Sequence, residues 1–193
     1  MRPQTDNKKA LILATLIRML EQPHAGRITT AALAQQLDQS EAALYRHFSS
    51  KAALFESLID SARAQLLEDL NHIAATESDG CRKLRKQLHA LLLFTERHPG
   101  LTRVLTGEAL VTEHPRLQIQ VNALIDDLEA LLRHAAQAAI DAGSLQPRDT
   151  ADSAVYANTL MLWVQGRWLR YTQTGWQALP THEHEPQLAL LGL

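Results

Sequence analysis

A short segment near the N-terminus carries hydroxyl, phenol and guanidinium groups at a spacing that suits binding of an extended anion. Thr29 and Ser40 each precede a short segment whose apolar residues recur at helical spacing. At such a position the side-chain oxygen caps the helix, and the free backbone amides of its first turn point outward. Thr30 lies beside the first cap, and Tyr45 and Arg46 follow the second by about one helical turn. These groups form hydrogen bonds and ion pairs with phosphate oxygens. The expected chemistry is therefore non-covalent binding.

Two short helices joined by a tight turn must position these groups. The spacing predicts helices at about 30–37 and 41–48, with Asp38 and Gln39 in the turn, and Asp tolerates a left-handed backbone better than most residues. Such short helices are unstable alone, so flanking helices must support them. The residues predicted to lock the pair together are Leu33, Leu37, Leu44 and Phe48.

The second helix of the pair then presents a distinctive outer face. Glu41, Ala42 and Ala43 face outward at its start, ahead of Tyr45 and Arg46. Small residues allow the backbone to approach a surface closely, while the two long side chains reach further. This geometry is expected of a recognition helix that enters the DNA major groove with its N-terminus first.

The rest of the chain also indicates helices only. Further helices are expected at about 6–20, from a cap at Ser49 or Ser50 to about 77, and then at 81–97, 101–111, 115–143, from Asp149 or Thr150 to 172, and at 186–193. Strand-period alternation and repeats are absent. The predicted fold is all-α, with a helix-turn-helix domain at 1–52 and a helical dimerisation and partner-binding domain at 53–193. The last two long helices are expected to form a four-helix dimer interface through their apolar residues Leu131, Leu132, Ala135, Val155, Leu160, Leu162 and Leu169.

Composition and charge fit an intracellular DNA-binding protein. Hydrophobic residues make up 46% of 193 residues, and the single cysteine, Cys81, excludes an internal disulfide or a thiolate metal cluster. Stretches long enough to span a bilayer are absent, so we expect a cytoplasmic protein without membrane contact. Residues 1–51 hold seven basic and four acidic residues, a net charge of +3, whereas the remainder has 12 basic and 17 acidic residues, or −5. A basic head on an acidic body suits contact with phosphate at one end.

Catalytic and cofactor chemistry is not indicated. The sequence offers neither a nucleophile–base grouping nor a glycine-rich phosphate loop, so we expect no enzyme activity, catalytic residue or cofactor. His182–Glu185 resembles a metal clamp, but a solvated linker is the favoured interpretation. Aromatic residues of the last long segment fit either a ligand pocket or, preferably, core and dimer-interface packing; they are Tyr156, Trp163, Trp168, Tyr171 and Trp176.

The segments 28–34 and 40–48, followed by Lys51 and Leu54, resemble the DNA-binding domain of the TetR family. The resemblance implies that Tyr45, His47 and Lys51 contact DNA phosphates, with packing alone as the alternative for Tyr45. For Arg46, a base contact and a solvated side chain remain open. The chain departs from the family pattern in the turn, where Asp38–Gln39 stands in place of Gly-Val.

A second block, 96–107, is similar to a branch of this family that acts in nucleoid occlusion. The resemblance implies a homodimer that binds double-stranded DNA and opposes the division protein FtsZ. Arg97 and His98, with Lys86 as a helper, are the expected anchors for an acidic FtsZ tail, although Arg97 capping its own helix is an equal alternative. Two other functions stay open: a ligand-responsive repressor that binds a small molecule, and a helical interaction module that has lost DNA binding.

Overall fold

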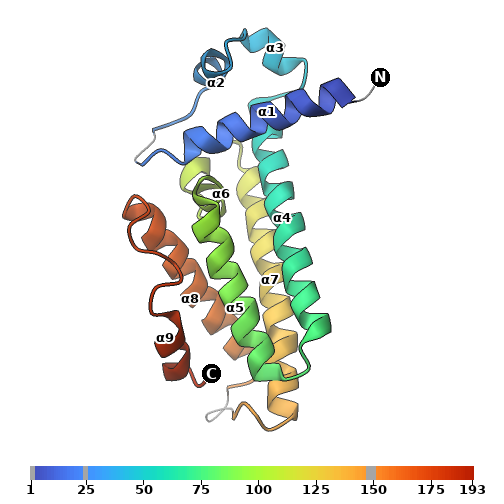
Figure 1. Cartoon of the computed structure of the whole chain (residues 1–193), viewed down its shortest axis with the longest axis vertical. Coiled ribbons are helices and arrows are strands. Elements are labelled where there is room, and N and C mark those ends of the chain that lie inside the picture. Colours follow the sequence, from blue (N-terminus) through green and yellow to red (C-terminus); the bar gives the residue numbers. More distant parts are fainter. Residues whose placement is uncertain (1–2, 24–25, 147–150) are drawn as a thin grey trace. The chain divides into compact units, whose positions relative to one another are not determined.

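The computed structural model describes residues 3–23, 26–146 and 151–193, with side chains from residue 7 onward. All regular structure in these ranges is helical, and none of the described residues forms a strand, which confirms the predicted fold class. The helices (Figure 1) are α1 (Pro3–Leu20), α2 (Thr30–Gln36), α3 (Glu41–Tyr45), α4 (Lys51–Thr76), α5 (Gly80–Arg97), α6 (Pro99–Leu105), the 3₁₀ helix η1 (Glu108–Leu110), α7 (Arg116–Asp141), α8 (Ser153–Gln173) and α9 (His184–Leu190).

The chain forms two compact units. The first contains residues 1–62 and 98–121, and the second contains residues 63–97 and 122–193. Helices α4 and α7 therefore each begin in the first unit and end in the second. The functional division at 52/53, which the sequence suggested, stays a prediction.

The first unit buries the apolar stripe of α1 against the short helices. Ile12, Leu16 and Leu20 are almost completely buried, as are Leu33 of α2 and Leu44 of α3. Helix α6 approaches α1 so closely that a Cβ added at Gly100 would lie 2.6 Å from the carbonyl oxygen of Ile17. This crowding explains why glycine occupies that position.

The sixth helix differs from its predicted span of 101–111. It begins at Pro99. Proline fits the first position of a helix, because the amide hydrogen that it lacks would have no acceptor within the helix there. It ends at Leu105, and Gly107 then adopts a left-handed backbone with φ of 78°. Only the short η1 follows, so the predicted helix is divided into two pieces.

Other helix ends differ from prediction by smaller amounts. Helix α1 starts at Pro3, α3 ends at Tyr45 and α9 starts at His184. The cap of α8 is Asp152, whose Oδ1 accepts hydrogen bonds of 3.0 Å from the amides of Ala154 and Val155. The predicted caps Asp149 and Thr150 lie outside the described residues.

The second unit is built around α5 and α8, which pack against each other. Trp168 is fully buried, and the hydroxyl of the buried Tyr171 donates to the carbonyl of Glu96 at 3.2 Å. Both aromatics therefore belong to the core, as favoured from the sequence. Trp163 instead lines a surface cavity beside Arg167, whose guanidinium lies 4.9 Å from its ring centre.

The segment 182–185 is more structured than the predicted linker. His184 begins α9, and its Nδ1 lies 2.7 Å from the carbonyl oxygen of Thr181 while its Nε2 lies 3.0 Å from Nδ1 of His89. The linker interpretation is therefore wrong for His184. Within the described ranges, no group of three or more His, Cys, Asp or Glu residues is placed to hold a metal ion.

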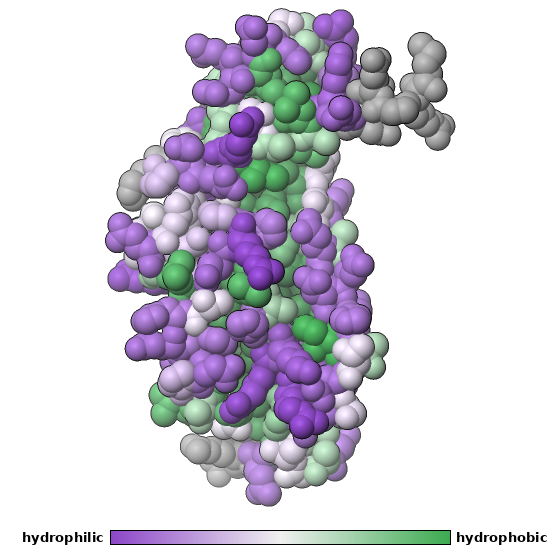
Figure 2. All heavy atoms as spheres, viewed as in Figure 1, coloured by the Kyte–Doolittle hydropathy of each residue, from purple (hydrophilic) through white to green (hydrophobic). Residues whose placement is uncertain are grey.

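The face of the molecule drawn in Figure 2 is largely polar. Figure 2 shows a face covered mainly by hydrophilic residues, with apolar residues visible between them. In the described part of the chain, no helix combines the length and apolar character needed to cross a bilayer.

Candidate DNA interface

Both short helices of the first unit are capped by the hydroxyls that the sequence singled out. Oγ1 of Thr29 accepts from the amide of Ala32 at 3.1 Å, and Oγ of Ser40 accepts from the amide of Ala43 at 3.3 Å. Each cap is exposed, and a hydroxyl that accepts one hydrogen bond keeps a proton to donate. Both hydroxyls therefore cap their helices and keep a proton for an outside acceptor.

The turn between α2 and α3 is a Schellman motif built around Asp38. The amide of Gln39 donates to the carbonyl of Ala34 at 2.9 Å, and that of Asp38 donates to the carbonyl of Gln35 at 3.1 Å. Asp38 has φ of 52°, in the left-handed region where glycine is usual. The turn predicted for Asp38–Gln39 is therefore present, and a non-glycine residue makes it.

The outer face of α3 carries the expected polar groups. Glu41, Ala42 and Arg46 are exposed, Tyr45 is 47% exposed, and Ala43 is partly covered. Figure 1 shows α2 and α3 following each other at one end of the first unit. The exposed face offers a phenol and a guanidinium beside small residues, which is the composition that a groove-reading helix needs.

Three of these side chains form a hydrogen-bonded chain. The hydroxyl of Thr30 donates to Oε2 of Glu41 at 2.5 Å, and the hydroxyl of Tyr45 lies 3.5 Å from Oγ1 of Thr30. The first contact is short, whereas the second is at the outer limit for a hydrogen bond. The start of α2 is thus tied to α3, while the phenol of Tyr45 is only weakly held and can turn towards another acceptor.

His47 and Lys51 are less open than the sequence suggested. His47 is half-buried, and its Nδ1 is enclosed without a hydrogen-bond partner among the described residues. The ammonium of Lys51 pairs with the carboxylate of Glu113 and lies 5.6 Å from the ring centre of Phe55. Glu113 lies 62 residues further along the chain, too distant for local sequence patterns to reveal.

The predicted partner residues lie within α5, at its C-terminal end and at the start of α6. Arg97 is exposed in the last turn of α5, and the half-buried His98 is the N-cap position of α6 without a side-chain capping bond. Lys86 lies three turns earlier on the same face, about 16 Å away at 1.5 Å per residue. The half-buried Ala90 and Leu93 separate the two cations.

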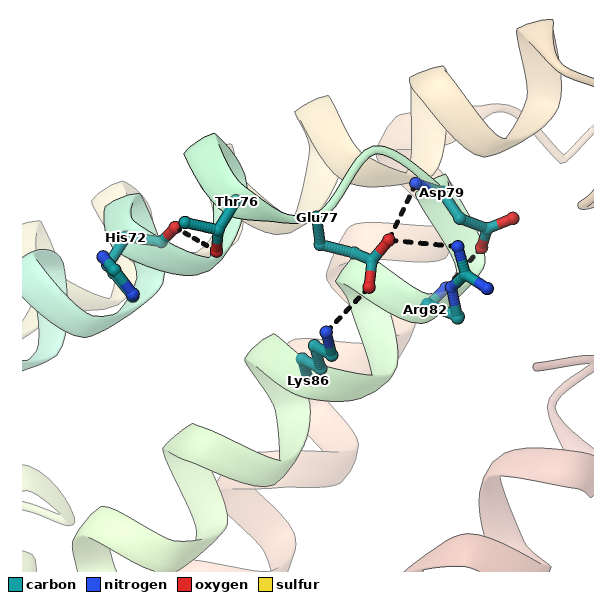
Figure 3. A network of polar contacts seen from close by, with 6 residues as sticks. All are labelled: His72, Thr76, Glu77, Asp79, Arg82 and Lys86. Atoms are coloured by element: carbon teal, nitrogen blue, oxygen red, sulfur yellow. Dashed lines mark hydrogen bonds and ion pairs between the residues drawn. The ribbon is translucent and has the colours of Figure 1, made fainter.

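Lys86 belongs to a charged network at the corner between α4 and α5 (Figure 3). Its ammonium lies 2.7 Å from Oε2 of Glu77, while Oε1 of Glu77 accepts from the amide of Asp79 at 3.1 Å and from Arg82 at 3.3 Å. The hydrogen bond from Lys86, followed by that from the Asp79 amide, lowers the pKa of Glu77 to about 2. Lys86 is still largely exposed, so its charge also faces solvent.

Comparison with known proteins agrees with this geometry. Residues 7–58 match the family profile of bacterial regulatory proteins of the TetR family, and residues 78–192 match the SlmA-like form of the tetracyclin repressor-like C-terminal domain. The nucleoid occlusion factor SlmA of Idiomarina loihiensis is 39% identical over 97% of this chain and 94% of its own length. SlmA of Vibrio cholerae is 40% identical over 96% and 94%, respectively.

Solved structures agree in fold. The Bacillus subtilis regulator FadR, in complex with stearoyl-CoA, superposes with a TM-score of 0.75 at 14% identity, covering 94% of this chain and 96% of its own. A TetR-family regulator from Agrobacterium tumefaciens gives 0.72 at 19% identity, covering 96% and 98%.

The fold and the capped helix pair define a DNA-binding regulator of the helix-turn-helix class. The chain belongs to the TetR family of bacterial regulatory proteins and, within it, to the group of nucleoid occlusion factors called SlmA.

Proposed function

We propose that this protein binds specific chromosomal DNA sites as a homodimer through α3 and, while bound, inhibits FtsZ assembly so that no septum forms over the nucleoid. It acts in the cytoplasm, on the nucleoid. The observation that supports DNA binding most strongly is the exposed face of α3, capped by Ser40 and fixed by the Schellman turn at Asp38.

Each residue of this face has a proposed role. Small side chains at Ala42 and Ala43 admit the helix to the groove floor, and Arg46 reaches the base edges. Backbone phosphates are bound by the residues around that face: Thr29, Thr30, Ser40, Tyr45, His47 and Lys51. Because the hydroxyl of Thr30 donates its only proton to Glu41 in their 2.5 Å hydrogen bond, Thr30 is proposed to meet a phosphate through its backbone amide in the first turn of α2.

A fluorescence-anisotropy titration with chromosomal DNA fragments tests the proposal. Ala43→Glu places a carboxylate against the groove and is expected to abolish specific binding. Lys51→Ala removes a phosphate contact, so binding should weaken about equally on all sequences. Arg133→Ala, an exposed site on α7, is the control for loss of a positive charge. Unchanged affinity in both head variants contradicts the assignment.

The FtsZ part of the proposal is supported by the exposed face of α5. Lys86 and Arg97 supply two cations about 16 Å apart, with Ala90 and Leu93 between them. An extended peptide rises about 3.3 Å per residue, so five residues span this distance. Extended tails bind through a few apolar anchors combined with charge pairing. An acidic tail with an apolar centre is therefore the proposed ligand, with His98 as a neighbouring contact.

Titration of a labelled FtsZ tail peptide, with and without DNA, tests this surface. The wild type is expected to bind saturably, and Arg97→Glu should lose at least tenfold in affinity, since like charges replace a pair. Arg133→Glu reverses an exposed charge on α7 and should bind as the wild type does. Absence of saturable binding by the wild type in both states rejects nucleoid occlusion.

A second candidate, the ligand-responsive repressor, is supported by a cavity of about 590 Å³ in the second unit. Trp163, Leu179 and Ala178 provide apolar walls, and Arg167 and Arg170 provide charge. Binding sites for small molecules combine these features. This candidate gains if the tail peptide fails to bind and DNA from cells maps to a single promoter.

A further inference from the structure

The first turn of α4 presents less positive charge to DNA than its sequence suggests. Lys51 is the only basic residue of that turn, and its ammonium is paired with Glu113. We propose that Glu113 is an internal competitor for Lys51 that limits the affinity of this protein for the DNA backbone. The inference rests on the proposed phosphate contact of Lys51 and adds a residue that controls its strength.

The pair is well enclosed within the first unit. The side chain of Glu113 is only 7% exposed, that of Lys51 is 19% exposed, and the ring of Phe55 covers the ammonium from one side. In a second ion pair nearby, α4 supplies the acid and not the base: Nε of Arg116 lies 2.8 Å from Oε1 of Glu56. The two pairs hold the segment that follows η1 against the start of α4.

The local backbone fixes the position of the Glu113 carboxylate. The amide of Glu113 donates to the carbonyl of Leu110 at 2.9 Å, and the amide of Leu110 donates to that of Gly107 at 2.9 Å. Gly107 has φ of 78°, and a Cβ there would lie 2.6 Å from Oε1 of Gln118. Because glycine permits this turn, the chain returns to α4 directly after α6.

Release of Lys51 does not leave Glu113 in an apolar environment. Glu113 lines a cavity of about 220 Å³ together with Arg27 and Arg103. This volume has room for several water molecules. Arg103 already binds Glu108 at 2.8 and 3.0 Å, but its charge still acts across the cavity. The cost of separating the pair is therefore lower than for a dry buried carboxylate.

The exchange has a measurable electrostatic consequence. A lysine without an internal partner releases about one counterion when it binds a phosphate, which adds about 0.9 to the slope of log K against log salt. When Lys51 moves to a phosphate, Glu113 regains an unpaired charge that attracts a cation. The net contribution of Lys51 to the slope is therefore expected to be well below one in the wild type.

The test is a double-mutant cycle of Lys51→Ala and Glu113→Gln in the full-length protein, with DNA affinity measured from 50 to 200 mM salt. Glu113→Gln is expected to raise affinity roughly five- to tenfold per protomer at 0.1 M salt and to steepen the slope by about one. Lys51→Ala should lower the slope by about one in the Glu113→Gln background and by much less in the wild type. Asp60→Asn removes an exposed acid of α4 and measures the general charge effect.

The outcomes separate the two proposals. If Lys51→Ala weakens binding but Glu113→Gln changes affinity no more than Asp60→Asn does, the competitor role is wrong and the phosphate contact stands. If Lys51→Ala changes nothing in either background, the phosphate contact fails and the inference fails with it. Should Glu113→Gln not fold, Glu113→Asp keeps the charge but shortens its reach. An affinity above wild type supports competition, and an affinity equal to wild type contradicts it.

Discussion

The hydroxyl of Thr30 donates a 2.5 Å hydrogen bond to Glu41 and so joins the first turn of α2 to the first turn of α3. Thr30→Val keeps the shape of the side chain but removes the donor. Because both groups are at least partly exposed, the expected loss in unfolding free energy is modest, about 0.5–1 kcal/mol. Urea denaturation measures it, with Thr112→Val, an exposed threonine, as the control. Equal midpoints for Thr30→Val and wild type contradict a stabilising role.

Asp38 adopts a left-handed backbone at the position where a Schellman motif favours glycine. Asp38→Gly is expected to stabilise the protein by about 0.5–1 kcal/mol, since glycine carries no steric penalty there. Asp38→Val should destabilise it, because a branched Cβ suits this conformation least. Thermal unfolding of the two variants gives the comparison, and the same sign of change for both refutes the strain argument.

The pKa of Glu77 is lowered from 4.5 to about 2, mainly by Lys86 and by the amide of Asp79. A lowered pKa means that the folded state favours the carboxylate. The contribution of the Glu77 carboxylate to the free energy of unfolding is therefore complete above about pH 5 and disappears as the pH falls from 4.5 towards 2. Glu77→Gln should be less stable than the wild type at pH 7, with a smaller difference at pH 3. A difference independent of pH excludes this linkage.

Val155, Leu162 and Leu169 lie seven residues apart on α8 and are all exposed. Seven residues are nearly two helical turns, so the three form one apolar stripe that we propose as the dimer interface. Leu162→Glu is expected to give a monomer in analytical ultracentrifugation at micromolar concentration, whereas Leu190→Glu, exposed on α9, should remain dimeric. A monomeric wild type at that concentration contradicts the proposal.

Local features of the fold were predictable from the sequence. The caps at Thr29 and Ser40 and the turn at Asp38 depend on residues within a few positions of one another. The position of Trp168 on the last long helix likewise favoured core or dimer-interface packing over a ligand pocket, and the side chain is fully buried. The start of α6 was missed because Pro99–Gly100 was interpreted as a break, although proline fits the first turn of a helix.

Contacts between distant residues were not predictable. The partner of Lys51 depends on how α6 and η1 return the chain to α4, which no local pattern reveals. The spacing of apolar residues also identifies the apolar face of a helix, but it does not show whether that face packs inside the chain or against a second copy. Leu132, Ala135 and Leu160 were expected at the dimer interface, but they are buried inside the chain itself. This part of the prediction was wrong, whereas the half-buried Leu131 of α7 and the exposed Val155, Leu162 and Leu169 of α8 remain available for a partner.

The most direct test of the central proposal is sequencing of the DNA that co-purifies with the protein from cells. Nucleoid occlusion requires many binding sites dispersed over the chromosome, because a septum must be blocked wherever DNA lies. The expected result is a shared sequence motif at many separate positions, lost in Ala43→Glu. Recovery of one promoter alone contradicts nucleoid occlusion and favours the ligand-responsive repressor.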